Sequence, residues 1–295
     1  MIRPWTILGY TCAILCITAT SVDSKVLQPR IVGGTDGTVG EIPFYGAIYW
    51  KTSDVILCGG SLIGEEWFLT AGHCLREDIQ GNSDRKADAT LSVDSVNYRF
   101  GRIPSAPDSV VDAAEVIIHK DFNATGKGEN DIALVRLQKK VALTENVQIA
   151  KIYSGEVRVN DKLKVAGMGA IDKVSNEMSA TLKTLALTIA DPYHCRRFTS
   201  LYTNANGPRM CTTFIEERGV CYGDGGGPLY KEVANSSPVL VGVISTRGYI
   251  DPMERNICVP KNGTNFFTHA YYYLDWISKT TNVPKDQLLD NPQKN

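Results

Sequence analysis

Short apolar runs separated by turn-forming residues occupy most of the chain from residue 40 onward. In the first half these runs fall at Phe44–Trp50, Val55–Leu57, Trp67–Thr70, Leu91–Val93, Glu115–Ile118 and Ile132–Leu137. A second series falls at Lys162–Ala166, Leu182–Ile189, Val239–Ser245 and Phe266–Thr268. The runs are rich in β-branched and aromatic residues, which is typical of β-strands joined by hairpins. Many short strands without regular helical intervals predict an all-β fold, either a sandwich or a barrel.

The two ends of the chain follow other patterns. Arg3 precedes an apolar run from Ile7 to Ala19, and small residues follow, which is the pattern of a secretory signal peptide. We predict this peptide over residues 1–23; a membrane anchor or a buried helix is the alternative, although a span needs about 20 apolar residues. The apolar period of Tyr271–Ser278 predicts a C-terminal helix. Residues 280–295 form a polar tail that we expect to be frayed.

The composition narrows the classes of function. The 295 residues are 43% hydrophobic and 21% charged, which is ordinary for a globular protein. The formal net charge of −1 gives no reason to expect a nucleic acid or an anionic membrane as partner. No Cys-x-x-Cys pair occurs, so we expect no metal site, and we predict no cofactor.

Cysteines and glycosylation sequons indicate a secreted, extracellular protein. Cys12 and Cys16 would leave with the signal peptide, and an even number of cysteines then remains. This predicts disulfides formed in an oxidising compartment, but the spacing alone does not choose among the pairings. The remaining cysteines are Cys58, Cys74, Cys195, Cys211, Cys221 and Cys258, and the sequon asparagines are Asn123, Asn235 and Asn262.

Several local motifs follow one another in a fixed order. They are Ile31-Val32-Gly33-Gly34 after Arg30, Thr70-Ala71-Gly72-His73-Cys74, Asn130-Asp131-Ile132-Ala133-Leu134 and Cys221-Tyr222-Gly223-Asp224-Gly225-Gly226-Gly227-Pro228. Together they resemble the chymotrypsin/trypsin-like serine protease family, whose triad has the chain order His, Asp, nucleophile. The resemblance covers residue 31 to about residue 277 and implies two six-stranded antiparallel β-barrels with the site in the cleft between them. We place this domain at 31–279, with barrels at about 31–140 and 145–268.

The resemblance also implies covalent features. The disulfides would be Cys58–Cys74, Cys195–Cys211 and Cys221–Cys258. Residues 24–30 would be a short activation propeptide, and cleavage after Arg30 would free the Ile31 ammonium to pair with a buried Asp224. The alternative is that Arg30-Ile31 is an ordinary loop and that Asp224 is solvated.

The nucleophile position departs from the family pattern. The family reads Gly-Asp-Ser-Gly-Gly-Pro, whereas this chain has Gly225 in place of the serine. His73 and Asp131 match the base and its orienting carboxylate, and the N–H groups of Gly223 and Gly225 match the oxyanion hole. Glycine supplies no hydroxyl for covalent catalysis, and this loss costs roughly 10⁴–10⁶ in rate. His73 and Asp131 are then either a structural pair or a base that activates water. Ser245 matches a serine that holds the aspartate, so we do not expect it to attack substrate.

The specificity pocket departs from the family as well. Gly219 replaces the trypsin aspartate, Ser245-Thr246-Arg247 replaces the usual Ser-Trp-Gly, and Asn265 falls where a second pocket glycine is usual. We predict that the Arg247 side chain crosses the pocket mouth; the alternative is that it points into water.

These departures predict a secreted, catalytically inactive serine protease homologue that acts by binding another secreted protein. The resemblance offers three roles: a cofactor in an immune protease cascade, a decoy for protease inhibitors, or a paralogue that blocks complement. The alternative is a weakly active hydrolase that uses water activated by His73. A third option is a storage or structural protein that inherited the fold.

Overall fold

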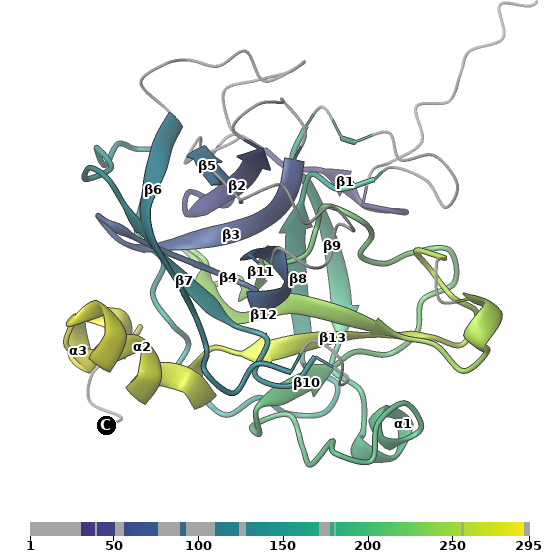
Figure 1. The fold of residues 1–295 in the computed structure, drawn as a ribbon. Coiled ribbons are helices and arrows are strands. Elements are labelled where there is room, and N and C mark those ends of the chain that lie inside the picture. Colours follow the sequence, from purple (N-terminus) through teal and green to yellow (C-terminus); the bar gives the residue numbers. More distant parts are fainter. Residues whose placement is uncertain are drawn as a thin grey trace, which may run out of the picture.

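The fold consists of two curled antiparallel sheets with few helices (Figure 1). This computed structural model describes residues 31–38, 40–50, 56–75, 89–92, 110–123, 128–170, 178–179, 181–254 and 257–291. The predicted signal peptide and the propeptide with Arg30 lie outside the described residues.

The first sheet is a closed barrel with the strand order β2-β3-β4-β7-β6-β5. Its strands are β2 (Tyr45–Trp50), β3 (Ile56–Gly64), β4 (Trp67–Thr70), β5 (Ala89–Ser92), β6 (Val110–Ile118) and β7 (Ala133–Leu137). Large apolar side chains such as Ile48, Leu62, Phe68 and Leu134 are fully buried inside it. Their burial is the main stabilising contribution here, since each large side chain contributes about 1.5–3 kcal/mol.

The second sheet has seven strands in the order β1-β9-β8-β11-β12-β13-β10. Its strands are β1 (Thr35–Asp36), β8 (Lys162–Gly167), β9 (Lys183–Thr188), β10 (Arg209–Cys211), β11 (Pro228–Lys231), β12 (Val239–Gly248) and β13 (Thr264–His269). The prediction of an all-β fold with two antiparallel barrel-like sheets is confirmed. The second sheet has one strand more than we predicted, because Thr35 and Asp36 pair with Thr184 and Lys183 of β9.

The helices that the structure describes are short. They are the α-helices α1 (Pro192–Arg196), α2 (Leu274–Thr281) and α3 (Lys285–Leu288), and the 3₁₀ turns η1 (Gly72–Leu75), η4 (Pro252–Glu254) and η5 (Tyr271–Tyr273). The predicted C-terminal helix is confirmed, with η5 as its first turn and α2 as its body. Within the described ranges, no helix has the length and apolarity needed to cross a bilayer.

The segment after α2 corrects one prediction. We expected residues 280–295 to form a frayed polar tail, but residues up to Asn291 are described, and Leu288 and Leu289 lie against Ile152 in the segment that joins the two sheets. Leu288 and Leu289 are 1% and 2% exposed, and the Ile152 N–H donates to the Leu288 carbonyl at 2.7 Å. Two adjacent leucines in a polar stretch give no periodic pattern of apolar residues. Their burial could therefore not be predicted from the sequence.

Three disulfides cross-link the described part of the chain. They are Cys58–Cys74, Cys195–Cys211 and Cys221–Cys258, the pairs that the family resemblance implies. The first joins β3 to η1, the second joins α1 to β10, and the third joins the loop before β11 to the loop before β13. A disulfide of this kind typically contributes about 3 kcal/mol. The asparagines of the three sequons, Asn123, Asn235 and Asn262, are exposed, and their glycosylation stays a prediction.

Candidate active site

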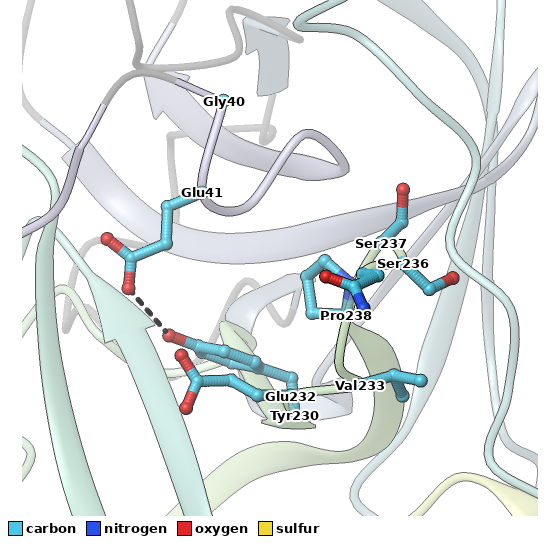
Figure 2. Close-up of a pocket in the computed structure, with 9 residues that line it drawn as sticks. Gly40, Glu41, Tyr230, Glu232, Val233, Ser236, Ser237 and Pro238 are labelled. Atoms are coloured by element: carbon cyan, nitrogen blue, oxygen red, sulfur yellow. Dashed lines mark hydrogen bonds between the residues drawn. The ribbon is translucent and has the colours of Figure 1, made fainter.

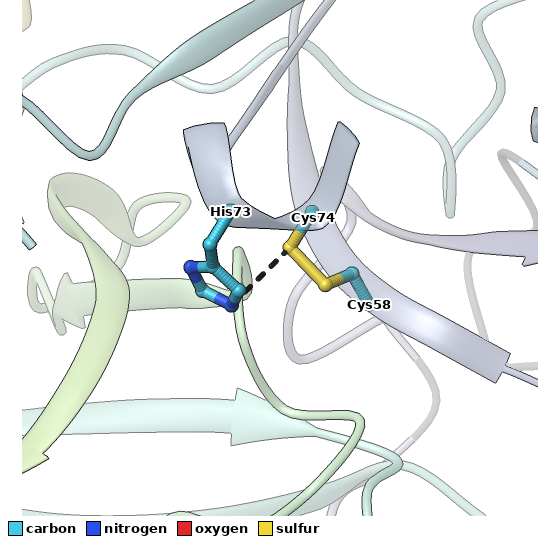
Figure 3. Close-up of side chains that lie close together, drawn as sticks. All are labelled: Cys58, His73 and Cys74. Atoms are coloured by element: carbon cyan, nitrogen blue, oxygen red, sulfur yellow. Dashed lines mark hydrogen bonds between the residues drawn. A yellow bond between two sulfur atoms is a disulfide. The ribbon is translucent and has the colours of Figure 1, made fainter. Parts of the chain in front are cut away.

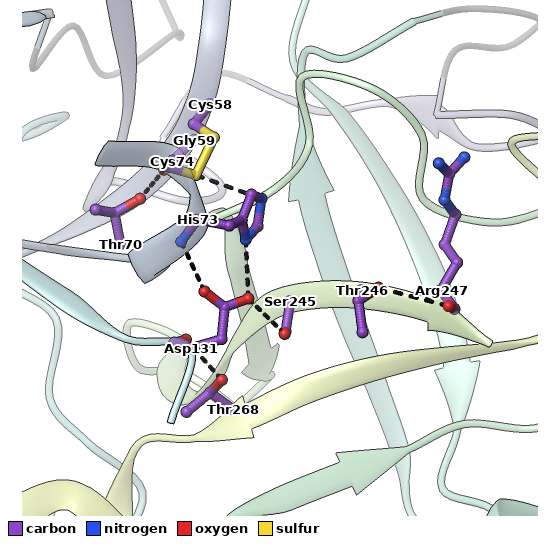
Figure 4. Close-up of polar contacts among 10 residues, drawn as sticks. All are labelled: Cys58, Gly59, Thr70, His73, Cys74, Asp131, Ser245, Thr246, Arg247 and Thr268. Carbon is purple, nitrogen blue, oxygen red and sulfur yellow. Dashed lines mark hydrogen bonds and ion pairs between the residues drawn. A yellow bond between two sulfur atoms is a disulfide. The ribbon is translucent and has the colours of Figure 1, made fainter. Parts of the chain in front are cut away.

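His73 and Asp131 are brought together from two parts of the first barrel (Figure 4). His73 lies in η1 directly after β4, and Asp131 lies just before β7. The His73 backbone N–H donates to Asp131 Oδ1 at 2.8 Å, and the ring Nδ1 lies 2.8 Å from Oδ2. One carboxylate therefore fixes both the backbone and the ring of the histidine, which is the arrangement of a base and its orienting group.

The second sheet holds Asp131 from the other side. Ser245 of β12 donates its hydroxyl to Asp131 Oδ2 at 2.6 Å, and Thr268 of β13 donates to the Asp131 carbonyl at 2.7 Å. The Ser245 hydroxyl is thus committed to the aspartate, as expected for a residue that does not attack substrate. Thr268 was missed at the sequence level, since a threonine in a strand carries no signal of such a contact. Arg209 of β10 was also missed; it is buried beside the Phe266 ring, 4.8 Å from its centroid.

The pair shifts the pKa of both partners. Burial alone would raise the pKa of Asp131, but the charge of His73 and the hydrogen bonds from His73 and Ser245 hold it below its usual value. Burial alone would lower the pKa of His73, but the charge and hydrogen bond of Asp131 raise it above its usual value. Asp131 therefore stabilises the imidazolium form of His73.

The nucleophile position offers backbone only. A Cβ built on Gly225 would lie 2.5 Å from His73 Nε2 and 3.0 Å from its Cε1. Real Cβ atoms are essentially never found at the shorter of these separations, so the imidazole occupies the space that a side chain at position 225 would need. The Gly59 N–H of β3 donates to the Gly225 carbonyl at 2.7 Å and fixes this loop against the first barrel.

The amide groups predicted to line an oxyanion hole face no acceptor within the part of the chain that the structure describes. Neither Gly223 N–H nor Gly225 N–H donates to another described residue. Gly223 has a φ of +87°, a conformation that side chains rarely adopt, so glycine is needed at this position. The loop therefore retains two free donors beside a position that lacks its nucleophile.

Cys58, His73 and Cys74 form a cluster of metal-ligating atom types (Figure 3). Their candidate ligand atoms lie within 4.8 Å of one another. However, Cys58 and Cys74 form a disulfide, and a metal requires thiolates. The cluster therefore offers only one imidazole nitrogen, and it serves to hold η1 and its histidine.

The other histidines lie in structural positions. His269 of β13 is buried, with Nδ1 3.3 Å from the Gly207 carbonyl, and burial lowers its pKa to about 4. His119 packs against Tyr273, with their ring centroids 5.4 Å apart. His194 lies in α1, where Asp191 caps its backbone N–H. These contacts of the three histidines are structural, and none joins the His73–Asp131 pair.

Asn265 fills the base of the region matched to the specificity pocket. Its Oδ1 lies 3.4 Å from the position of a Cβ on Gly219, and its Nδ2 donates to Thr212 Oγ1 at 3.3 Å. The residue is buried in β13. A neutral amide thus stands against Gly219, which has no side chain to recruit a basic residue.

Arg247 spans the mouth of the same region. It lies in β12 opposite Asn265 of β13. Its Nη1 donates to the Ile257 carbonyl at 3.2 Å, and its guanidinium lies over the Tyr222 ring, 4.7 Å from the centroid. Tyr222 and Ile257 each adjoin a cysteine of the Cys221–Cys258 disulfide. The side chain thus reaches from β12 to the two loops that this disulfide joins, and in Figure 4 it rises on the side of β12 where His73 lies.

The segment matched to the activation junction is docked in the second sheet. Ile31 is fully buried, and the Gly219 N–H donates to the Val32 carbonyl at 3.0 Å. Asp224 accepts hydrogen bonds from the N–H groups of Gly169 and Cys221, each at 2.8 Å. Burial raises the pKa of Asp224 to about 7. Asp224 is thus buried rather than solvated, and its ion pair with a cleaved Ile31 stays a prediction.

A separate hollow of about 550 Å³ lies beside Asn235 (Figure 2). The Tyr230 hydroxyl donates to Glu41 Oε1 at 3.4 Å across its floor. Lys164 pairs with Glu232 at 2.6 Å and with Glu41 at 3.7 Å. Lys164 thus compensates part of the charge of the two carboxylates, and a glycan on Asn235 would stand at the rim of the hollow. It offers no arrangement for catalysis.

Comparisons with known proteins agree with this geometry. The trypsin family model matches residues 31–277. The chain is 32% identical over 250 residues to chymotrypsin-2 of Vespa crabro, covering 84% of this chain and 99% of that protein. It is 27% identical over 252 residues to trypsin of Sus scrofa, covering 85% and 95%. It is also 27% identical over 267 residues to phenoloxidase-activating factor 1 of Holotrichia diomphalia, covering 86% and 70%. With its two antiparallel sheets, its three disulfides and this extent of similarity, the chain belongs to the trypsin family.

Proposed function

We propose that this chain is a catalytically inactive member of the trypsin family that acts by binding another secreted protein. The observation that supports this most directly is the contact between His73 and Gly225. A nucleophile is absent by residue type, and the ring stands 2.5 Å from where its Cβ would be. A covalent mechanism needs a hydroxyl or thiol at this point, and without one the family loses roughly 10⁴–10⁶ in rate.

The neighbouring hydroxyl does not compensate. Ser245 donates to the buried Asp131 carboxylate, and moving it toward a substrate would leave that carboxylate with one hydrogen bond fewer. Leaving a buried charged group short of a partner costs about 1–3 kcal/mol or more. The remodelled region around Gly219, Asn265 and Arg247 supports the same conclusion, since a trypsin-like cleft without its aspartate has no group to draw in a basic side chain.

A protein in the extracellular medium is the partner that these features favour. The three disulfides suit an oxidising compartment. The relative from Holotrichia diomphalia carries the name phenoloxidase-activating factor, which favours a cofactor role in an immune protease cascade over the inhibitor-decoy and complement-blocking roles. Cleavage after Arg30 would serve as the switch, by pairing the Ile31 ammonium with Asp224 and ordering the loops around it.

A fluorophosphonate probe tests the inactivity. The protein, cleaved after Arg30, is incubated with a fluorescent fluorophosphonate beside an active trypsin. We expect no labelling of the natural protein, and labelling of a Gly225→Ser variant once the His73 ring gives way. Stoichiometric labelling of the natural protein would overturn the proposal.

The rival hydrolase is tested with peptides. Cleavage by the natural protein that disappears in a His73→Ala variant would establish a water-based mechanism and refute inactivity.

Binding is tested by affinity capture from the native fluid with cleaved and uncleaved forms. We expect one protein to be enriched with the cleaved form; the absence of any enriched protein would favour a storage or structural role.

A further inference from the structure

We propose that Arg247 makes the mouth of the former specificity pocket a binding site for a carboxylate, so that the partner segment it accepts is acidic. This rests on the proposed role as an inactive binding protein and names the chemistry that its cleft would recognise. The shared ligand chemistry has two sources, the side chain of Asp or Glu in an extended segment and the carboxylate at the end of a chain. The experiment below separates them.

The first step is the state of the guanidinium. Arginine carries five N–H donors, and Arg247 uses Nη1 for the Ile257 carbonyl. Its guanidinium lies over the Tyr222 ring, and its charge interacts with the buried Asp224. Among the described residues no carboxylate lies within ion-pair distance of Arg247, although many other surface cations of this chain are paired. Within the described residues, this half-buried cation thus keeps most of its donors for a ligand.

The second step is preorganisation. The Arg247 backbone is fixed by pairing with Asn265 of β13. Its acceptor, the Ile257 carbonyl, and its stacking partner, Tyr222, adjoin Cys258 and Cys221, which the disulfide ties together. A guanidinium held by a backbone hydrogen bond and an aromatic face has little rotamer freedom left to lose on binding. The site is thus prepared before a ligand arrives.

The third step is the chemistry of the walls. A guanidinium offers a planar fork that matches a carboxylate with two parallel hydrogen bonds. Behind it stands the neutral amide of Asn265, beside Gly219. Asp224 is buried below the loop and already accepts two backbone N–H groups, so it is not available to a ligand. A basic side chain would meet like charge at the mouth and no available anion within, whereas an acidic one would meet a cation with open donors.

The alternative is that Arg247 only plugs the pocket. The two possibilities differ in what removal of the charge does: loss of a carboxylate site weakens acidic ligands selectively, whereas loss of a plug opens the cleft to any side chain. Four acetylated tetrapeptides discriminate between these two possibilities. They are acetyl-Ala-Ala-Ala-Glu-amide, its Gln and Lys counterparts, and acetyl-Ala-Ala-Ala-Ala with a free terminal carboxylate.

Binding is measured by NMR chemical-shift titration of the natural protein, which detects affinities in the millimolar range. We expect the Glu peptide to bind at least about tenfold more tightly than the Gln peptide, since a charge-assisted hydrogen bond contributes about 1.5–3 kcal/mol. The Lys peptide should be the weakest. Preference for the free-carboxylate peptide over the Glu peptide would assign the site to a chain terminus, and the reverse would assign it to an acidic side chain; either preference supports the proposal.

Two variants complete the test. Arg247→Gln should remove the preference for the charged peptide, and Arg247→Lys should retain part of it, because an ammonium keeps the charge without the fork. Equal binding of the Glu and Gln peptides to the natural protein would overturn the proposal. So would an Arg247→Gln variant that binds all the peptides more tightly, since that is the behaviour of a plug. None of these readouts depends on catalysis, so fluorophosphonate labelling would refute inactivity without affecting them.

Discussion

His73 Nε2 lies 2.5 Å from the position that a Cβ on Gly225 would occupy. The ring is held there by Asp131, which binds both the ring Nδ1 and the backbone N–H of the histidine. The observed position of the His73 ring therefore requires a residue without a Cβ at position 225. Restoring a side chain and keeping the present histidine geometry are mutually exclusive.

Replacing Gly225 by alanine should displace the His73 ring. The added methyl group meets the end of the ring, so the Nδ1 hydrogen bond to Asp131 must lengthen or break. Because Asp131 holds the pKa of His73 above its usual value, that pKa should fall toward about 6.5 in the variant. The NMR titration of the His73 ring protons measures this change.

A matched control is Gly37→Ala, where the nearest atoms to an added Cβ are 3.5 Å away. It should leave the His73 titration unchanged. If Gly225→Ala left it unchanged as well, the close approach of ring and backbone would be refuted.

Replacing Thr268 by valine should loosen Asp131. Thr268 donates to the Asp131 carbonyl at 2.7 Å, and a buried carbonyl left without its donor costs about 1–3 kcal/mol. The Asp131 backbone should then shift, and both the pKa of His73 and the stability of the protein should fall.

Thr264→Val is the control, since Thr264 donates to the Thr212 carbonyl at the other end of β13. It should lose comparable stability in urea unfolding while the His73 titration stays in place; equal titration curves for both variants would contradict the link.

The sequence predicted the site residues that are carried by local motifs. His73, Asp131, Ser245 and Gly225 each sit in a short stretch whose order along the chain is recognisable, and the structure brings the first three into one hydrogen-bonded network with the fourth in contact. The all-β pattern was equally readable, because strands such as Trp67–Thr70 alternate with clear turns.

Contacts between distant segments could not be predicted in this way. The two-residue strand β1 exists only because β9 offers a free edge, and β11 begins with Pro228, which argues against a strand when it is considered alone. Thr268 and the partners of Arg247 depend on which residues lie opposite one another in the second sheet. The anchor after α2 depends on contacts with Ile152 and Ser154, far earlier in the chain.

Truncation after Thr281 should therefore destabilise the fold. Leu288 and Leu289 bury their side chains against the core cluster, and Asp290 accepts the Ser154 N–H at 2.8 Å. Loss of two buried leucines costs on the order of 3–6 kcal/mol, which is a large part of the stability of a typical domain. Urea unfolding followed by tryptophan fluorescence measures the loss. The double variant Leu288→Ala, Leu289→Ala should reproduce most of it, and an unchanged midpoint for both proteins would mean that the segment is frayed after all.

Asp224→Asn should change the pH dependence of stability in opposite directions before and after cleavage at Arg30. In the uncleaved chain, burial raises the pKa of Asp224 to about 7, above the value of about 4 expected in the unfolded chain. Between these two values the folded state binds more protons than the unfolded state, so the natural protein loses stability as the pH rises from about 4 to about 7. A shift of this size corresponds to on the order of 4 kcal/mol. The asparagine side chain of the variant cannot ionise, so the uncleaved variant should be more stable than the natural protein at about pH 8 and no more stable at about pH 4.

Cleavage reverses this difference if the Ile31 ammonium reaches Asp224. The ion pair would lower the pKa of the carboxyl, and the natural cleaved protein would then gain stability as the pH rises toward about 4 and above. The cleaved Asp224→Asn variant would lack that gain. Urea unfolding of both proteins, cleaved and uncleaved, at about pH 4.5 and about pH 8 measures the four differences, with Asp286→Asn as the control for loss of an exposed charge. A substitution that is equally stabilising in both forms would mean that the new terminus stays away from the carboxylate, and the cleavage switch would have to be abandoned.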